Sequence, residues 1–254
     1  MGSLAIALVV FACSFGAAVL GMYLRPNSPV RDLDDHSRDV MKLVMGLVAT
    51  MAALVLGLLV ASADAAHRQQ TEELKDFSAE VVLLDRTLGL YGPDAQVVRD
   101  QLRDLVRQTH DAVWSLHDVR PENLNSEAVQ KAVRAQLARL VALAPKTDVQ
   151  RMLQSHAIEQ ADSVSRARLH MFESRDGQFA WPFLAMLIFW VSILFLGFGL
   201  LAPFNLTLAA TQFLGAISVA AAIFMILELN APFGGLMRVS DAPLKAAIAQ
   251  MDRS

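Results

Sequence analysis

The sequence predicts an all-α integral membrane protein in which a soluble helical bundle lies between the second and third of four transmembrane helices. Three stretches without charged side chains carry this prediction: residues 1–24, 43–63 and 177–227. The last stretch has 51 residues, which is too long for one span and sufficient for two. Residues 64–176 instead mix charged side chains with apolar ones at helical spacing, as water-soluble bundles do.

The composition agrees with this division and excludes several functions. Hydrophobic residues make up 54% of the 254 residues, yet 19% are charged, so the chain is not apolar throughout. A net charge of −3 gives no electrostatic reason to expect a nucleic-acid partner. Cys13 is the single cysteine, which excludes an intrachain disulfide, and the sequence has no clustered Cys and His of zinc-site type. We therefore expect no cofactor.

The first element is a predicted membrane span over residues 1–24. It lacks the basic start and the short apolar core of a cleaved secretory signal, and its uncharged run ends at Arg25. Residues 25–42 are rich in turn formers and in charges of both signs, which predicts a solvated connection too short to be a domain.

Residues 43–63 form the second predicted span. As a helix this stretch is about 31 Å long, close to the thickness of the hydrocarbon core of a bilayer. Small residues recur at every fourth position and form a groove that a neighbouring helix can approach closely: Ala49, Ala53, Gly57 and Ala61. The bulkier rows beside it are Leu47, Met51 and Val55, and Thr50, Leu54 and Leu58. In the alternative interpretation, both sides of this helix meet protein or lipid in an ordinary bundle.

A long amphipathic helix is predicted to continue from the second span. Apolar residues at alternating spacings of three and four form a seam of coiled-coil type: Leu74, Phe77, Val81, Leu84, Leu88 and Tyr91. No helix breaker lies between residues 63 and 91, so span and seam are expected to form one rod of about 50 residues, roughly 75 Å long. The rod is expected to end at Gly92 and Pro93.

Three further helices complete the predicted bundle. We expect one over residues 94–118, a shorter one capped by Asn125 or Ser126, and a long one that begins near Asp148. The inward face of the last is predicted to carry Val149, Met152, Leu153, His156, Val164 and Ala167. A short amphipathic helix is expected over residues 240–251.

The uncharged run at 177–227 is predicted to turn near Asn205, which separates a third span, residues 180–202, from a fourth, residues 206–229. Eight basic residues lie near the membrane on the bundle side and four on the other side, which favours a cytoplasmic bundle and cytoplasmic termini. The expected domains are the first two spans with their loop, the bundle, the membrane hairpin and the tail: residues 1–63, 64–178, 179–229 and 230–254.

Few residues of the sequence are candidates for catalysis, metal binding or ion selection. His110 and His117 share a helix face, but their backbones would be about 10.5 Å apart, too far for one metal ion to bind both, so we interpret them as surface residues. The sequence shows no activated nucleophile, Gly-rich phosphate loop or paired carboxylates, so we do not expect an enzyme. Asp64 and Glu228 lie at the bundle-side ends of spans. They either reach headgroup water or, where several subunits meet, form the mouth of a pore that favours cations.

Three segments resemble one known family. These segments are ILELNAPFGGLMRVS at residues 226–240, GLVATMAALVLGLLVASA in the second span and RDLDDHS at residues 31–37. Together they resemble the bacterial bestrophin-like domain family, a domain of unknown function that is distantly similar to the bestrophin ion channels. This resemblance covers essentially the whole chain. It implies four membrane helices, cytoplasmic termini and a helical cytoplasmic domain between spans two and three.

The resemblance also bears on ligands. Asn230, Pro232, Phe233 and Gly234 are similar to the Asn-Pro-Phe-Gly motif that follows the fourth span of bestrophins, with Ala231 inserted. In bestrophins the motif runs into an acidic cluster that binds calcium, whereas here residues 235–238 read GLMR. Calcium needs six or more oxygen ligands, so we do not expect calcium gating.

The functional expectation is an oligomeric channel or pore for inorganic ions in the bacterial inner membrane, with five subunits as the resemblance implies. The second span would line the pore, and Leu47, Thr50, Met51, Leu54, Val55 and Leu58 are the candidate wall residues. Apolar side chains on successive turns would close the pore by excluding water. The alternative is a non-conducting scaffold or sensor anchored in the membrane, which binds partners through the seam at Leu74–Tyr91.

Overall fold

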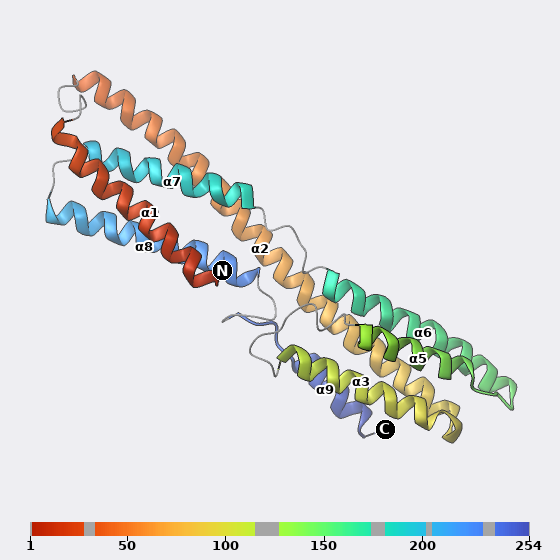
Figure 1. Cartoon of the computed structure of the whole chain (residues 1–254). Helices are drawn as coiled ribbons and strands as arrows, with labels where there is room; N and C mark the ends of the chain where they lie inside the picture. Colours follow the sequence, from red (N-terminus) through yellow and green to blue (C-terminus); the bar gives the residue numbers. More distant parts are fainter. Residues whose placement is uncertain are drawn as a thin grey trace. The chain divides into compact units, whose positions relative to one another are not determined.

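The structure, a computed structural model, describes residues 2–27, 34–114, 127–173, 181–201, 205–230 and 237–253. Over these residues every regular element is a helix and no strand occurs (Figure 1), so the predicted all-α class is confirmed for them. The chain divides into two compact units. Unit 1 comprises Met1–Ala66 and Gln178–Asn230, and unit 2 comprises His67–Gly177 and Ala231–Ser254.

Among the described residues, four helices are long and apolar enough to cross a membrane, and all four contribute to unit 1. They are α1 (Ser3–Leu24), α2 (Asp35–Tyr91), α7 (Trp181–Leu201) and α8 (Leu206–Leu229). A short 3₁₀ helix, Arg25–Asn27, follows α1. The side chain of Asn205 caps α8 by accepting a hydrogen bond from the Thr207 N–H at 3.2 Å. Because α2 starts at Asp35, part of the connection predicted at residues 25–42 is helical.

Two glycines let the backbones of α1 and α7 approach closely within unit 1. A side chain added at Gly21 would collide with the carbonyl oxygen of Leu196, and one at Gly199 would collide with that of Ala18. Both glycines are buried, and α1 packs against α7 and α8. Small residues at such crossings are the usual means by which membrane helices gain packing contacts.

Replacing Gly21 by alanine is therefore expected to force α1 and α7 apart and to destabilise unit 1 by about 1–3 kcal/mol, the usual cost of over-packing. Gly16→Ala is the matched control, because it lies on the same helix and its methyl group would meet no atom within 4 Å. Thermal unfolding in lipid nanodiscs should show a lower midpoint for Gly21→Ala alone. Equal midpoints for the two variants would contradict this close contact.

Unit 2 is a helical bundle built on the carboxyl-terminal part of α2. After α2 ends at Tyr91, Gly92 adopts a φ of 107°, a conformation that favours glycine, and the chain turns as predicted. The 3₁₀ turn Pro93–Ala95 leads into α3 (Gln96–Trp114), and α5 (Glu127–Val141), α6 (Asp148–Glu173) and α9 (Ala242–Met251) follow.

The predicted coiled-coil seam lies inside unit 2. All six of its residues are buried in the hydrophobic core of this unit: Leu74, Phe77, Val81, Leu84, Leu88 and Tyr91. They share that core with residues of α3, α5, α6 and α9, such as Leu102, Leu140, Ala157 and Leu244. The seam therefore offers no apolar surface to a partner protein, and the scaffold alternative loses its main support.

The prediction for the inward face of α6 is wrong in its first turns. The sequence predicts Val149, Met152 and His156 to be buried, but all three are exposed. The core side is instead formed by residues from Leu153 and Ala157 onward. His110 also differs from its expected surface position. It is largely buried, its ring stacks on Trp114 with centroids 5.5 Å apart, and its Nε2 lies 3.3 Å from Asp241 Oδ2.

A buried cluster of charges ties α2 to α3. Arg99 donates from Nε and Nη2 to the two carboxylate oxygens of Asp85, at 2.9 and 2.8 Å, and Arg103 donates from Nε at 3.1 Å. The Asp85 side chain is only 1% exposed. Burial by itself raises the pKa of Asp85, but the hydrogen bonds from Arg99 and Arg103 outweigh it and hold the pKa below its usual value.

Candidate functional site

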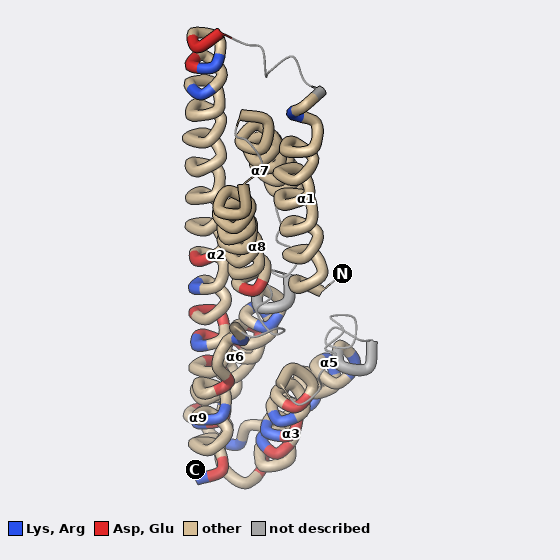
Figure 2. Tube along the Cα trace, turned by 90° about the vertical axis from the view of Figure 1, so that its left-hand side faces the viewer, with Lys and Arg blue, Asp and Glu red and all other residues tan. Residues whose placement is uncertain are grey.

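The candidate site lies on the uncharged part of α2. Charged residues occupy α2 up to Lys42 and again from Asp64, and the segment between them carries none (Figure 2). This segment belongs to unit 1, where its side chains pack with those of α1, α7 and α8.

One face of this segment is a continuous apolar stripe. Leu47, Met51, Leu54 and Leu58 follow each other at spacings of four, three and four, which places them on one side of a helix. All four are exposed within the chain, and Leu54 is the most exposed at 75%. Thr50, beside them, is also exposed, and its hydroxyl donates to the Leu47 carbonyl at 2.7 Å. Val55 is half-buried, so the structure unites four of the six predicted wall residues in the stripe.

The small-residue row lies beside this stripe and is not what packs against the helices of unit 1. Ala53, Gly57 and Ala61 are exposed, Ala49 is half-buried, and a side chain at Gly57 would meet no atom within 4 Å. The buried side of the segment consists instead of Met45, Ala52, Leu59 and Ala63. Successive residues of a helix are rotated by 100° about its axis, which places the small-residue row on the flank of the stripe. A helix from outside unit 1 can therefore contact both the row and the stripe.

Met45 shows why this other side is buried. Its terminal atoms fill the space where Gly197 of α7 lacks a side chain, since a Cβ on Gly197 would lie 2.7 Å from Met45 Cε. The small residue at this contact is thus on α7 and the long, flexible one on α2. A search for small residues on α2 alone does not find this contact.

The two predicted pore-mouth carboxylates differ in exposure. Asp64 is half-buried at the end of the uncharged segment, whereas Glu228, in the last turn of α8, is only 5% exposed. Among the described residues, no group of three or more Asp, Glu, His and Cys could hold a metal ion.

The family motif is described only at its first residue. Asn230 caps the carboxyl end of α8, where its backbone N–H, at 3.2 Å, and its side-chain amide, at 2.8 Å, both donate to the Ile226 carbonyl. Pro232, Phe233 and Gly234 lie outside the described residues.

Two buried polar side chains in the spans are missed by the sequence prediction, which considers only charge. Ser14 of α1 is completely buried, and its hydroxyl has no hydrogen-bond partner among the described residues. Gln212 of α8 is also buried. Ser14 and Gln212 could have been identified from the sequence, because a hydroxyl or amide group within an apolar span is costly to place in lipid.

The geometry supports a water-excluding wall better than it supports catalysis. A stripe of leucine and methionine offers no nucleophile, acid or base, but several copies around an axis would form a narrow apolar passage.

Comparison with known proteins gives two matches. A family model of the bestrophin-like domain matches residues 12–244. A crystal structure of a bacterial bestrophin homologue from Klebsiella pneumoniae, carrying a mutation, matches with a TM-score of 0.64 and 11% sequence identity. The match covers 97% of this chain and 96% of that chain, and at this identity it shows a common fold. No curated protein matches the sequence.

Proposed function

The chain belongs to the bestrophin-like domain family, and from this premise we propose that it forms an ion channel or pore in the bacterial inner membrane. The observation that carries the proposal is the apolar stripe of Leu47, Met51, Leu54 and Leu58, which α2 turns away from the other helices of its own unit. A second copy of the chain can therefore meet α2 from this side. The fold shared with a bacterial bestrophin homologue supports the same interpretation.

In the proposed channel, several subunits, five by analogy with bestrophins, surround an axis that α2 faces. The small-residue row packs against the neighbouring subunit, because Ala53, Gly57 and Ala61 let another helix approach closely. The stripe then forms the wall, with Thr50 and Val55 at its edges. Rings of leucine and methionine constrict the passage and close it by dewetting.

The charged residues suggest the direction of the channel. We place the bundle from residue 64 to 178 and the tail from residue 230 in the cytoplasm, with both termini, because basic residues are more frequent on that side. Asp64 then contributes negative charge directly to the inner mouth. Glu228, whose side chain is buried, contributes through its electrostatic field. Both carboxylates favour inorganic cations at this end.

Ion flux and subunit number test the proposal together. Purified protein in phospholipid vesicles is expected to dissipate a potassium or a chloride gradient faster than empty vesicles do. Native mass measurement of the same preparation should give a closed ring, with five copies as the expected number. A monomer or dimer that passes neither ion would overturn the proposal and would revive the scaffold alternative.

A further inference from the structure

The carboxyl-terminal tail of the chain is attached to α3 at both ends of α9. Both helices belong to unit 2 and lie side by side (Figure 1). Just before α9, the Val239 carbonyl accepts a hydrogen bond from the indole Nε1 of Trp114 at 3.1 Å. Just after α9, Asp252 forms an ion pair with Arg107 of α3. The position of α9 on the bundle therefore depends on polar side chains of α3 as well as on the hydrophobic core.

His110 of α3 lies between two carboxylates. Its Nδ1 is 3.0 Å from Oδ1 of Asp111, the next residue, and its Nε2 is 3.3 Å from Oδ2 of Asp241, the residue before α9. The His110 side chain is 15% exposed and that of Asp241 is 25% exposed, against 70% for Asp111. Of the two contacts, the one that joins α3 to the tail is therefore the better protected from water.

The neighbours of His110 suit its protonated ring. A neutral imidazole has a single N–H, so it donates to one carboxylate and turns the lone pair of its other nitrogen toward the second. The imidazolium donates from both nitrogens. The ring also stacks on Trp114, with centroids 5.5 Å apart and planes at 19°, and the face of an indole attracts a cation. All three neighbouring groups therefore interact more favourably with the charged ring.

Asp241 is held in its ionised form by a second cation. The Lys245 ammonium, one turn into α9, lies 2.7 Å from its Oδ2. Lys245 first, and His110 to a smaller extent, hold the pKa of Asp241 below its usual value against the opposing effect of burial. The Asp241 carboxylate therefore stays charged over the pH range in which histidine titrates, and only the His110 side of the contact changes its charge.

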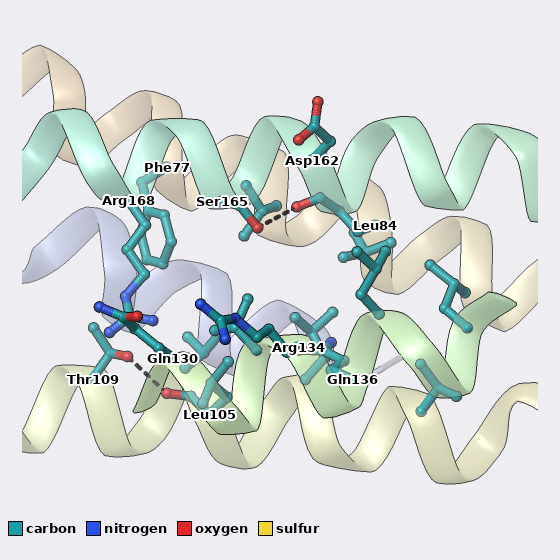
Figure 3. Close-up of a pocket in the computed structure, with 18 of the residues that line it drawn as sticks. Phe77, Leu84, Leu105, Thr109, Gln130, Arg134, Gln136, Asp162, Ser165 and Arg168 are labelled. Carbon is teal, nitrogen blue, oxygen red and sulfur yellow. Dashed lines mark hydrogen bonds between the residues drawn. The ribbon is translucent and has the colours of Figure 1, made fainter. Parts of the chain in front are cut away.

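No further charged group takes part in this contact. Asp111 and Asp241 are the charged residues that contact His110 within the described part of the chain. Charged residues of α5 and α6, such as Arg134 and Arg168, instead line a cavity to which α3 contributes Thr109 but not His110 (Figure 3). The balance of charge at His110 is thus set by α3 and by the start of α9.

We propose that His110 is a pH-sensitive latch, which holds the start of α9 on α3 while its ring is protonated and loosens it when the proton is lost. Histidine changes charge between pH 5 and 8. Loss of the charge weakens the contact with Asp241 in either neutral tautomer, and one tautomer also loses the hydrogen bond. The Trp114 hydrogen bond, the Arg107 ion pair and the apolar core do not titrate in this range, so α9 stays attached. The proposal is independent of ion conduction.

Hydrogen exchange of the full-length protein in lipid nanodiscs tests the latch. Exchange is followed at pH 5.5 and 8.5, with times scaled for the faster chemical exchange at the higher pH. The amides of α9 are the readout, such as that of Lys245, which donates to the Asp241 carbonyl at 2.9 Å. The amides of α6 are the reference. Relative to α6, protection at the start of α9 is expected to fall about tenfold at pH 8.5, as loss of a charge-assisted hydrogen bond implies.

Two substitutions fix the charge of residue 110. His110→Gln is neutral and His110→Arg is charged at both pH values, so both should remove the pH dependence, with low protection of α9 in the first variant and high protection in the second. Asp241→Asn should also remove it, which gives a further measurement if a His110 variant folds poorly. His156→Gln, at an exposed histidine of α6, is the control and should keep the wild-type pH dependence.

The outcomes that contradict the latch are equally specific. Protection of α9 that stays constant between pH 5.5 and 8.5 in the wild-type protein would overturn the proposal. The same holds if the pH dependence of α9 persists in His110→Gln or His110→Arg while α6 remains protected, because the titrating group would then lie elsewhere.

Discussion

Replacing Leu54 by asparagine is expected to raise ion flux through the reconstituted protein by about tenfold or more. Leu54 is the most exposed residue of the apolar stripe, and in a ring the substitution recurs in every subunit. A polar ring holds water where leucine excludes it, and a barrier lower by about 1.4 kcal/mol already gives a tenfold increase in rate. Met51→Asn, one turn away, should act in the same direction. The measurement is single-channel conductance or vesicle flux at equal protein density.

The matched control is Leu214→Asn on α8. Leu214 is a leucine of another apolar helix that is similarly exposed within the chain, at 63% against 75% for Leu54, so the chemical change is the same. Only the substitution on α2 should change the flux. If Leu214→Asn raised flux equally, or if neither the wild-type protein nor any variant passed ions, α2 would not be the wall of a pore.

Replacing Asp85 by alanine is expected to destabilise unit 2 by about 3–5 kcal/mol, which is the usual cost of removing one partner of a buried ion pair. The variant would leave Arg99 and Arg103, whose side chains are only 10% and 16% exposed, without their common carboxylate. Hydrogen exchange of the amides of α3 and of the second half of α2 measures this loss locally, without requiring the membrane unit to unfold. Exchange there should become faster at pH 7.

Two comparisons separate this effect from a general loss of acidic residues. Asp94→Ala removes the partner of Lys146 in an exposed pair and should change exchange far less.

The folded-state pKa of Asp85 is lowered, so its contribution to stability is present above the unfolded value of about 3.9 and is lost as pH falls through the folded pKa. Wild-type unit 2 should therefore weaken below about pH 4, whereas Asp85→Asn should lack this part of the pH dependence. An unchanged acid profile in Asp85→Asn would contradict the role of the cluster.

The positions of helices along the chain can be predicted from this sequence because local signals determine them. Uncharged runs locate the described helices that are long and apolar enough to cross a membrane, Gly92 ends α2 through its backbone conformation, and Asn205 caps α8 through its own side chain. The third and fourth spans, expected at residues 180–202 and 206–229, agree closely with Trp181–Leu201 and Leu206–Leu229.

The orientation of a helix about its axis is harder to predict, because it depends on the partner. The small-residue row of α2 satisfies a general rule for helix packing, yet unit 1 buries Met45 and Leu59, since Gly197 of α7 provides the space for Met45. Likewise, Val149 and Met152 of α6 are apolar but precede the part of the helix that meets the core. For the candidate site, the sequence proposes two bulky rows. In the structure, the exposed stripe takes Leu47 and Met51 from one row and Leu54 and Leu58 from the other.

The small-residue row of α2 has a mechanical consequence in the proposed ring. To the interface with the next subunit this row contributes only the methyl groups of Ala53 and Ala61 and the bare backbone at Gly57, and therefore no side-chain hydrogen bond. Movement of this face against its neighbour would cost α2 only dispersion contacts, each worth roughly 0.1–0.2 kcal/mol. Because the stripe lies beside this row, a small turn of α2 would exchange the residues that face the axis. The passage could then widen or narrow without breaking any directional bond between subunits.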